Sequence, residues 1–504
     1  MRGRWSAAVA GACLLAAGGC DQAGVVTAGH APGTAGPGGT ETVAGGWGRA
    51  ALVRGPAAMP RDGQPRLAAI SCTSPGNCTA GGSYALPPYV GPAHALVVSQ
   101  SHGSWGAARL VPGLARLDKG PASDVGIVSC VSAGNCTAAG SYQPVPNRAV
   151  GPSYGEPFVV SQVHGRWHTA RPLPGFAALN TGRLAWIAGL SCTGPGFCSA
   201  AGYYTVQTRT ARKKAAFVVS EVQGRWLRAR QAPGTAALGT GGEAQLLTLS
   251  CASPGNCAAG GYGKRGGFVL SQVNGRWLPA RLVTGLPGFA VVSSVSCAAP
   301  GDCAAGGTYA DPADHGQAFV ADEVNGRWRP AEPVAGIARL NKGRRADITF
   351  MSCTAPGDCT ATGSYSPMPY QNGSSYDVPF VVSQVHGRWG AGRPVPRLAM
   401  LDVGDNATIF GLSCASPGNC AADGTYAGGP GHLPAFVVSQ VRGSWGPAQQ
   451  VPGLAALGGT GAVPYGVSCP AAGRCNAVGA VEIGRRRHLT QTAFVVSFGG
   501  GGRR

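Results

Sequence analysis

The sequence predicts an all-β fold: an eight-bladed β-propeller of four-stranded antiparallel blades, closed by an N-terminal strand that completes the last blade. The first observation is a repeat, because sixteen of the eighteen cysteines form eight C-x5-C pairs spaced 46 to 62 residues apart. The second is that the pairs are followed by short β-type segments resembling A-x-G-x-Y, F-V-V-S-Q-V and G-R-W. The third is that the last repeat lacks a G-R-W segment, while residues 46–53 (GWGRAALV) supply one before the first repeat.

The displaced segment favours a closed ring over an open array of sheets. In a ring, an N-terminal strand that completes the last blade leaves no blade edge unpaired. An open array gains nothing from such a permutation. Two smaller rings, or a split assembly, remain an alternative interpretation of the eight repeats.

One repeat shows how each element follows from the sequence. Its expected strands are A at 124–130 (DVGIVSC), B at 136–142 (CTAAGSY), C at 157–163 (PFVVSQV) and D at 166–173 (RWHTARPL). The segment VSAGN forms the A–B turn, and His164-Gly165 forms a tight C–D turn. No segment of the chain has a convincing helical period.

One tryptophan per repeat stands at the start of strand D. A large apolar side chain at one position of every blade predicts packing between blades rather than a platform for stacking a ligand. These residues are Trp47, Trp105, Trp167, Trp226, Trp277, Trp328, Trp389 and Trp445.

The two ends of the chain lie outside the repeats. Residues 1–20 combine two arginines, a short apolar run and a small-residue cleavage site, which together indicate a secretory signal peptide. This segment resembles a bacterial lipoprotein signal, which implies that Cys20 is acylated and anchors the chain to the membrane; cleavage elsewhere stays open. We expect a flexible tether at residues 21–43, the propeller at residues 44–498 and a disordered tail at residues 499–504. We therefore expect an exported protein, either on the outer surface of the cytoplasmic membrane or secreted.

The cysteine pairs predict eight disulfides. No histidine recurs beside them, so they do not form the four-ligand clusters of a zinc site, and we expect neither a metal nor a cofactor. In an exported chain, a disulfide across each A–B hairpin is the simpler outcome. The expected disulfides are Cys72–Cys78, Cys130–Cys136, Cys192–Cys198, Cys251–Cys257, Cys297–Cys303, Cys353–Cys359, Cys414–Cys420 and Cys469–Cys475.

The net charge of +19 has two interpretations. One is an anionic partner, such as a wall polymer or lipid head groups. The other is a codon preference for arginine with the charge spread evenly over the repeats, which the recurring G-R-W arginine favours. Export argues against nucleic acid as a partner.

The repeated pattern S-C-x5-C-x-A-x-G-x-Y, followed by F-V-V-S-Q-V-x-G-R-W, resembles the Cys-pair repeats of exported β-propeller-like proteins of high-GC bacteria. The resemblance covers Gly46 to Phe498 and implies the propeller fold, but that family is largely without an assigned activity. More distantly, S-x-x-x-G-x-W, as in Ser161–Trp167, is similar to the Asp-box hairpin of sialidase-like propellers. The Asp is absent and the spacing is one residue shorter, so glycosidase activity does not carry over.

The candidate binding face is the one formed by the B–C and D–A loops, because these loops vary while the A–B and C–D turns are uniform. Residues six before the first Cys of a pair begin strand A and are expected to ring the mouth of the central channel. They are Arg66, Asp124, Trp186, Gln245, Asp347 and Thr408. The candidate ligand-binding residues are Arg66, Asp124, Trp186 and Asp347, with the loop residues Tyr89, Tyr154 and Tyr370.

Two further patterns have ordinary explanations. Asp124 and Asp347 are expected to lie too far apart for a tight carboxylate pair. The more widely spaced pair of an inverting glycosidase remains an alternative. A recurring L-[D/N]-x-G segment contains Asp118, Asn180, Asn341 and Asp402 and favours an Asx-turn over a calcium site.

The sequence contains no Ser/His/Asp set, G-x-S-x-G or H-E-x-x-H motif. It therefore favours a non-enzymatic, monomeric binding or scaffolding module for a glycan, a peptide or an anionic envelope polymer. The alternative is a glycosidase- or lyase-like propeller enzyme with its site at the top of the channel, using Asp124, Asp347 or Arg66. A structural envelope component without a ligand is a third hypothesis.

Overall fold

The computed structural model describes residues 46–55, 63–85, 93–120, 122–145, 155–239, 243–369, 376–404, 406–429, 432–457, 459–485 and 488–499. The predicted signal peptide, Cys20 and the predicted tether lie outside these residues, as does the predicted tail beyond Gly499.

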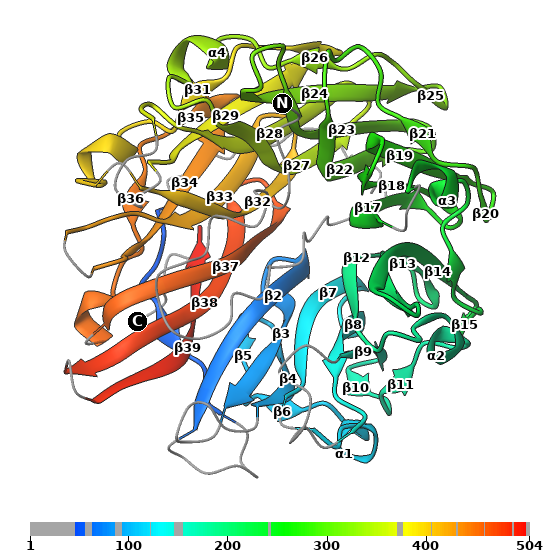
Figure 1. Cartoon of the computed structure of the whole chain (residues 1–504). Helices are drawn as coiled ribbons and strands as arrows, with labels where there is room; N and C mark the ends of the chain where they lie inside the picture. The colour runs from blue at the N-terminus through cyan, green and yellow to red at the C-terminus, as the bar shows by residue number, and fades with distance from the viewer. Residues whose placement is uncertain are drawn as a thin grey trace, which may run out of the picture.

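The chain forms an eight-bladed β-propeller, as predicted. Eight antiparallel sheets follow one another around a common centre, and the colour in Figure 1 runs once round the ring from the first blade to the last. In every blade strand A is innermost and strands B, C and D follow outward. We number the blades 1 to 8 in the order of their A strands.

The A strands are β2 (Gln64–Ser74), β7 (Asp124–Ser132), β12 (Ala185–Gly194), β17 (Ala244–Ser253), β22 (Ala290–Ala299), β27 (Ala346–Ala355), β32 (Thr408–Ser416) and β37 (Gly459–Ala471). The B strands are β3 (Asn77–Ala85), β8 (Asn135–Tyr142), β13 (Phe197–Gln207), β18 (Asn256–Gly263), β23 (Asp302–Ala310), β28 (Asp358–Tyr365), β33 (Asn419–Thr425) and β38 (Arg474–Arg485). The C strands are β4 (Ala93–Ser101), β9 (Glu156–Val163), β14 (Arg212–Val222), β19 (Gly266–Val273), β24 (Gly316–Val324), β29 (Val378–Val385), β34 (Ala435–Val441) and β39 (His488–Phe498).

Strand D differs from the prediction, because in blades 1 to 7 it is divided into two short segments that both pair with strand C. The first segments are β5 (Ser104–Trp105), β10 (Arg166–Trp167), β15 (Arg225–Trp226), β20 (Arg276–Trp277), β25 (Arg327–Trp328), β30 (Arg388–Trp389) and β35 (Ser444–Trp445). The second segments are β6 (Arg109–Leu110), β11 (Arg171–Pro172), β16 (Arg230–Gln231), β21 (Arg281–Leu282), β26 (Glu332–Pro333), β31 (Arg393–Pro394) and β36 (Gln449–Gln450).

The break in strand D has a physical cause in the neighbouring blade. Between the two segments of blade 2, the N–H of Ala170 donates to the carbonyl of Pro112 in blade 1 at 2.8 Å instead of to its own strand C. Equivalent bonds join every neighbouring pair of blades. Their donors are Ala50, Ala108, Ala170, Ala229, Ala280, Ala331, Gly392 and Ala448.

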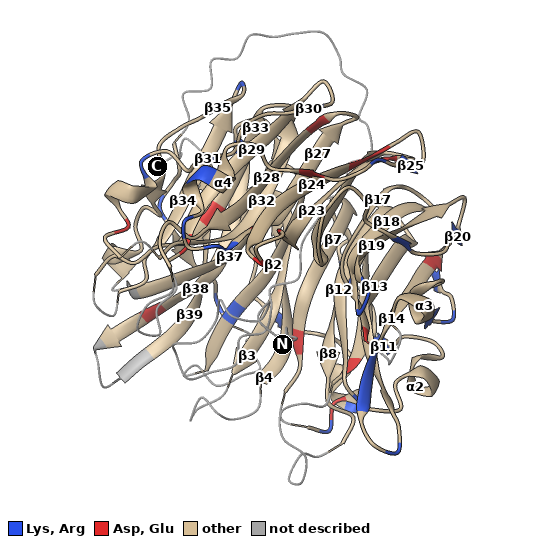
Figure 2. Cartoon of the chain, turned by 45° about the horizontal axis from the view of Figure 1, so that its top comes forward, with Lys and Arg blue, Asp and Glu red and all other residues tan. Residues whose placement is uncertain are grey.

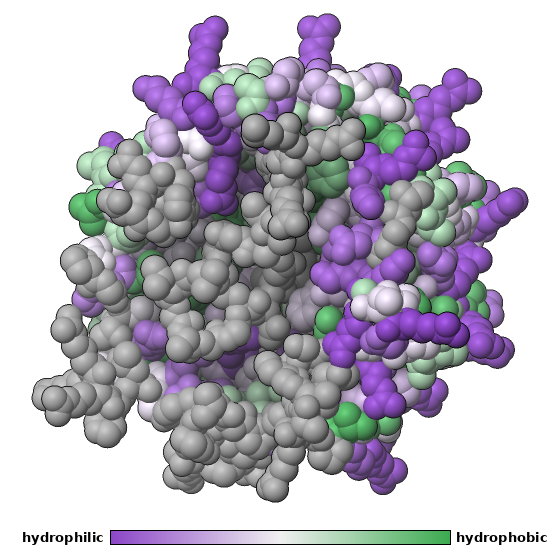
Figure 3. Space-filling model, in the orientation of Figure 1, coloured by the Kyte–Doolittle hydropathy of each residue, from purple (hydrophilic) through white to green (hydrophobic). Residues whose placement is uncertain are grey.

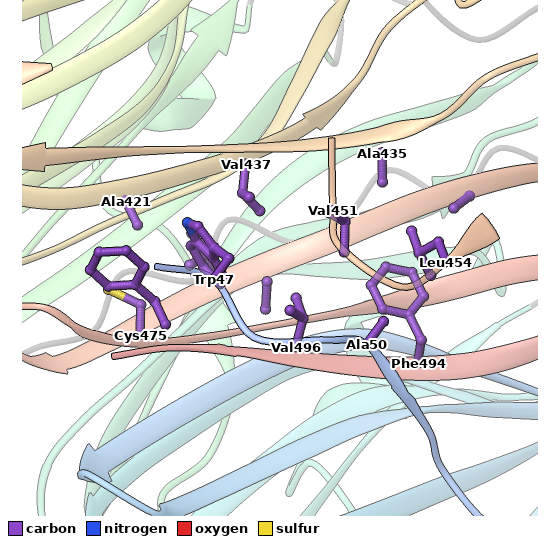
Figure 4. Packing of buried hydrophobic residues seen from close by; sticks show 14 of the residues in the cluster. Trp47, Ala50, Ala421, Ala435, Val437, Val451, Leu454, Cys475, Phe494 and Val496 are labelled. Atoms are coloured by element: carbon purple, nitrogen blue, oxygen red, sulfur yellow. The ribbon is translucent and has the colours of Figure 1, made fainter. Parts of the chain in front are cut away.

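The N-terminal segment lies at the outer edge of blade 8. Strand β1 (Ala51–Leu52) pairs antiparallel with β39, and Trp47 forms a further bridge with Phe498. Figure 4 shows Trp47 in the packing between Ala421 and Val437 of blade 7 and Cys475 of blade 8. This tryptophan therefore packs between blades.

All eight predicted disulfides are present. The strands run past the cysteines, so the A–B turn has two central residues rather than the five between the cysteines, as at Pro75-Gly76. The positive φ of 78° at Gly76, after a proline, is the chemistry of a type II turn. Eight disulfides indicate an oxidising environment outside the cytoplasm.

The serine before each first cysteine joins neighbouring blades. The N–H of Cys130 in blade 2 donates to Ser71 Oγ of blade 1 at 3.0 Å, and the bond from Cys72 to Ser468 Oγ at 2.9 Å joins blade 1 to blade 8. The same bond recurs at every blade junction. The donors are Cys72, Cys130, Cys192, Cys251, Cys297, Cys353, Cys414 and Cys469. The S-C dipeptide of the repeat thus builds a closed belt of hydrogen bonds.

Short helices follow strand D in six blades, where no helical period was found. They are α1 (Leu114–Leu117), α2 (Phe176–Leu179), α3 (Thr235–Leu238), α4 (Ile337–Leu340) and the 3-10 turns η1 (Leu398–Met400) and η2 (Ala455–Leu457). One turn is too short to produce a period in the sequence. None of the helices in the described ranges has the length and apolar composition that crossing a membrane requires.

Candidate functional site

The residues six before the first Cys begin the innermost strands, but the structure divides them among three surroundings. Asp124 and Asp347 bond within their own blades, Arg66 contacts blade 8, and Gln245 bonds to Lys214. Trp186 stands opposite Tyr203 on strand B and lines a small pocket together with Asp124. Tyr89, Tyr154 and Tyr370 lie outside the described residues.

The two aspartates have the same structural partners. Asp124 Oδ1 accepts a bond of 2.6 Å from Ser141 Oγ, and Asp347 Oδ1 accepts one of 3.0 Å from Ser364 Oγ. Each serine stands opposite its aspartate on strand B. Burial raises the pKa of Asp347, and the bonds from Ser364 oppose that rise. The aspartates belong to blades 2 and 6, on opposite sides of the ring, so the fold does not bring them together (Figure 1).

A group of one arginine and two aromatic residues lies at the ring centre on blades 7, 8 and 1. We call Arg66, Phe410 and Tyr465 the arginine–aromatic cluster. The Arg66 guanidinium lies 5.3 Å from the centre of the Tyr465 ring, and the Phe410 ring meets that of Tyr465 edge-on at 6.1 Å. All three side chains are partly exposed. The cluster thus offers a cation and aromatic surface on three consecutive innermost strands.

A β-bulge explains why the sequence did not reveal Phe410 and Tyr465. In every blade the residue four before the first Cys is skipped by the A–B pairing, which locally bends strand A. In the other six blades this residue is Ala68, Gly126, Ala188, Leu247, Ser293 or Thr349. The sequence signal that could have revealed these two residues is an aromatic side chain at a position where the other six blades have smaller side chains.

A second group lies between blades 3 and 4. Lys214 Nζ lies 4.8 Å from the centre of the Tyr203 ring and donates to Gln245 Oε1 at 3.2 Å. Gln245 Nε2 in turn donates to Tyr262 Oη at 2.7 Å. Burial lowers the pKa of Lys214, while the charge of Glu243 opposes that change. Trp186 stands opposite Tyr203 in the A–B ladder. We call these residues the Lys214 cluster.

The following side-chain bonds of the L-[D/N]-x-G segments do not have the Asx-turn pattern that the sequence predicts, in which the side chain accepts the N–H two residues later. Oδ1 of Asp118, Asn180 and Asp402 accepts the N–H of a residue 25 positions later, at the end of strand B. Asn341 Oδ1 instead accepts the N–H of Arg345, four residues later, at 2.8 Å. These side chains tie the D–A connection to strand B. No group of three His, Cys, Asp or Glu suited to a metal occurs among the described residues.

A small cavity lies on the disulfide face, between blades 5 and 6, with a volume of about 50 Å³. Its lining includes Asp302, Asp322 and Glu323, where other blades have mostly uncharged residues. Asp322 accepts bonds from Trp389 Nε1 and Gln384 Nε2, and Glu323 accepts one from Ser271 Oγ at 2.6 Å. Burial raises the pKa of both carboxyl groups. A space of this size admits a few waters but no sugar.

Positive charge is spread around the described part of the ring (Figure 2). Figure 2 shows Lys and Arg around the ring rather than on one face, and Figure 3 shows hydrophilic side chains projecting from its periphery. The exposed basic residues Arg209, Arg212, Lys264 and Arg265, at or between the ends of strands B and C, form only part of this charge. The distribution agrees with charge carried by every repeat.

Comparison with known proteins finds distant folds only. No family model and no curated sequence matches the chain. A Dyadobacter fermentans protein of unknown function shares 10% identity, with 90% of this chain and 98% of that chain covered and a TM-score of 0.41. An ulvan lyase shares 10% identity, covering 89% and 93%, with a TM-score of 0.41. A Hadza microbial sialidase shares 10% identity, covering 80% and 72%, with a TM-score of 0.39. At such identities and scores, these proteins say nothing about the activity of this chain.

Proposed function

We propose that the protein is an exported binding module that recognises an anionic glycan at the centre of the ring, with Cys20 as its membrane anchor. The observation that carries this proposal is the arginine–aromatic cluster, where Arg66 stacks on Tyr465 beside Phe410. The Lys214 cluster repeats the combination of a cation and an aromatic ring on another part of the ring, and it adds the amide group of Gln245.

This combination suits a sugar that carries a carboxylate or sulfate. Aromatic faces accept the apolar C–H face of a sugar ring, and a guanidinium binds an oxyanion through two parallel N–H donors. Binding is favoured over hydrolysis because the candidate catalytic carboxyl groups, those of Asp124 and Asp347, lie in opposite blades. Each of them is also hydrogen-bonded to a serine of its own blade.

Titration calorimetry with oligogalacturonate and a neutral oligosaccharide of equal length tests the proposal. The first variant is Arg66→Val, because blades 5 and 8 have a valine at the equivalent position, Val291 and Val463. Loss of a bond to a charged group, about 1.5–3 kcal/mol, should weaken binding of the charged ligand roughly 10- to 100-fold and leave the neutral one unchanged. Tyr465→Thr, which introduces the residue that blade 6 has there as Thr349, should weaken both ligands.

Thr408→Val is the matched control, since it changes the equivalent position of blade 7 without touching charge. If the native chain binds no acidic oligosaccharide, or if Arg66→Val binds as tightly as the control, the proposal is wrong. Release of new sugar ends that Asp124→Asn or Asp347→Asn abolishes would instead favour the enzyme.

A further inference from the structure

The C–D hairpins of the disulfide face share a rigid tip. In blade 2 the turn residues His164 and Gly165 both have positive φ, 49° and 79°, which defines a type I′ hairpin turn. The Gly165 N–H donates to the Gly134 carbonyl of the A–B turn at 2.8 Å. Equivalent glycine bonds occur in blades 1 to 7. The donors are Gly103, Gly165, Gly224, Gly275, Gly326, Gly387 and Gly443. Each C–D tip is therefore fixed to the disulfide hairpin of its own blade.

The residues that flank these turns form a repeated pair of one valine and one arginine. In blade 2, Val163 stands directly opposite Arg166. The same pair occurs in five consecutive blades, 2 to 6, and we call it the Val–Arg arc. Its pairs are Val163/Arg166, Val222/Arg225, Val273/Arg276, Val324/Arg327 and Val385/Arg388.

The Val–Arg arc is exposed on both its apolar and its charged side. Four of the valines have exposed fractions of 40%, 42%, 44% and 55%, where a β-strand valine would ordinarily be covered. Leu227 and Leu278 add exposed apolar surface next to it. All five arginines are exposed, and within the described ranges none forms a salt bridge. Apolar and cationic groups thus alternate around more than half of one face.

We propose that this face docks on a negatively charged lipid bilayer, with the arginines against the head groups and the valines inserted shallowly between them. A bilayer surface is the partner that uses both components, since head groups attract cations while the interface accepts apolar side chains. A soluble anionic polymer would use the arginines and leave the valines in water.

The position of the N-terminal segment supports this orientation. Gly48 N–H donates to the Ser497 carbonyl, and Gly499 N–H to the Gly46 carbonyl, at the end of β39 nearest the disulfide of blade 8. The preceding chain therefore joins the propeller at the face that carries the Val–Arg arc. This docking is independent of glycan recognition at the strand-A starts.

Blade 1 provides natural substitutions for the test, because its tip has Ser101 and Ser104 where the arc has valine and arginine. The first variant changes Arg166, Arg225, Arg276 and Arg388 to Ser. The second changes Val163, Val222, Val273 and Val385 to Ser. The control removes four arginines from the outer edge, with Arg171, Arg230, Arg281 and Arg393 changed to Gln as in blade 7, where Gln449 occupies this position.

The assay is co-sedimentation of the chain from residue 21 onward, which lacks an acylation site, with vesicles of equal parts phosphatidylglycerol and phosphatidylcholine. Each charge contributes about fivefold to partitioning, so the variant that lacks four arginines should partition roughly several hundred-fold more weakly. The valine variant should lose roughly tenfold. The outer-edge control should change by no more than a few-fold at physiological salt, because its charges lie four residues, about 13 Å, further along strand C.

Two outcomes overturn the proposal. Equal losses in the arginine variant and the control would show attraction by net charge alone. If the valine variant partitions like the native chain, and soluble polyglutamate displaces the protein from the vesicles, the face is a binding site for an anionic polymer. Far-ultraviolet circular dichroism of every variant checks that the propeller is folded.

Discussion

Asp423 gives the sharpest prediction on stability. It lies on β33 of blade 7 and is fully buried, and neither carboxyl oxygen has a hydrogen-bond partner of normal geometry. Burial raises the pKa of Asp423 to about 8, although the nearby backbone N–H groups of Gly466 and of Asp423 itself oppose the rise. Other blades have small or apolar residues here. They are Gly81, Ala139, Ala201, Gly260, Gly306, Thr362 and Val478.

The substitution Asp423→Ala should stabilise the protein, and more so as pH rises. Between about pH 4 and pH 8 the unfolded chain releases a proton that the folded chain keeps, so the free energy of unfolding falls with rising pH. The contribution is fully present below the unfolded pKa of 3.8 and is lost as pH rises through about 8. At about 1.36 kcal/mol per pH unit, the loss between pH 4 and pH 7 is on the order of 4 kcal/mol.

Urea unfolding, followed by tryptophan fluorescence at several pH values, measures this difference. The stability gained by Asp423→Ala over the native chain should grow steadily from pH 4 to pH 7. Asp423→Asn should remove the same pH dependence, because its amide does not titrate, while it still leaves a buried polar group. A gain that does not depend on pH, or a loss of stability at all pH values, would refute the reasoning.

Three other changes test the frame of the ring. Ser71→Ala leaves the Cys130 N–H without its acceptor in blade 1, and should lower the free energy of unfolding by about 1–3 kcal/mol in urea. Glu221 is buried, which raises its pKa to about 7, and most blades have Gln there. Glu221→Gln should therefore raise the melting temperature at pH 8 and have little effect at pH 4. A larger rise at pH 4 than at pH 8 would contradict the raised pKa of Glu221. Thiol labelling of the denatured, unreduced chain from residue 21 onward should find no free thiol, and substantial labelling would exclude the eight disulfides.

The propeller and its disulfides were predictable because they depend on local, repeated features. Alternation of residues along a strand, turn glycines and cysteines at constant spacing act within one hairpin, so each repeat states them independently. The division of strand D was not predictable. It arises because the N–H of Ala170 meets a carbonyl of the preceding blade, which the sequence of one repeat does not contain.

The candidate site was predictable only in part. The strand-A starts pointed to Arg66 and Trp186, while Tyr465, on which Arg66 stacks, and its neighbour Phe410 were missed. Phe410 and Tyr465 occupy the skipped position of a β-bulge, and they come from blades that are distant from Arg66 in the sequence. The Asx-turn interpretation was wrong for Asp118, because its acceptor oxygen finds an N–H 25 residues later.

By itself, the sequence determined the number of blades, the pairing of the cysteines and which loops vary, since all of these are properties of a single repeat counted eight times. The tertiary structure alone decided how the blades bond to one another, which acids lose contact with water and which cations meet aromatic rings. These depend on the approach of neighbouring blades around the ring. Only this closure brings Ser71 next to Cys130 and places Arg66 on the ring of Tyr465. The same closure buries Asp423.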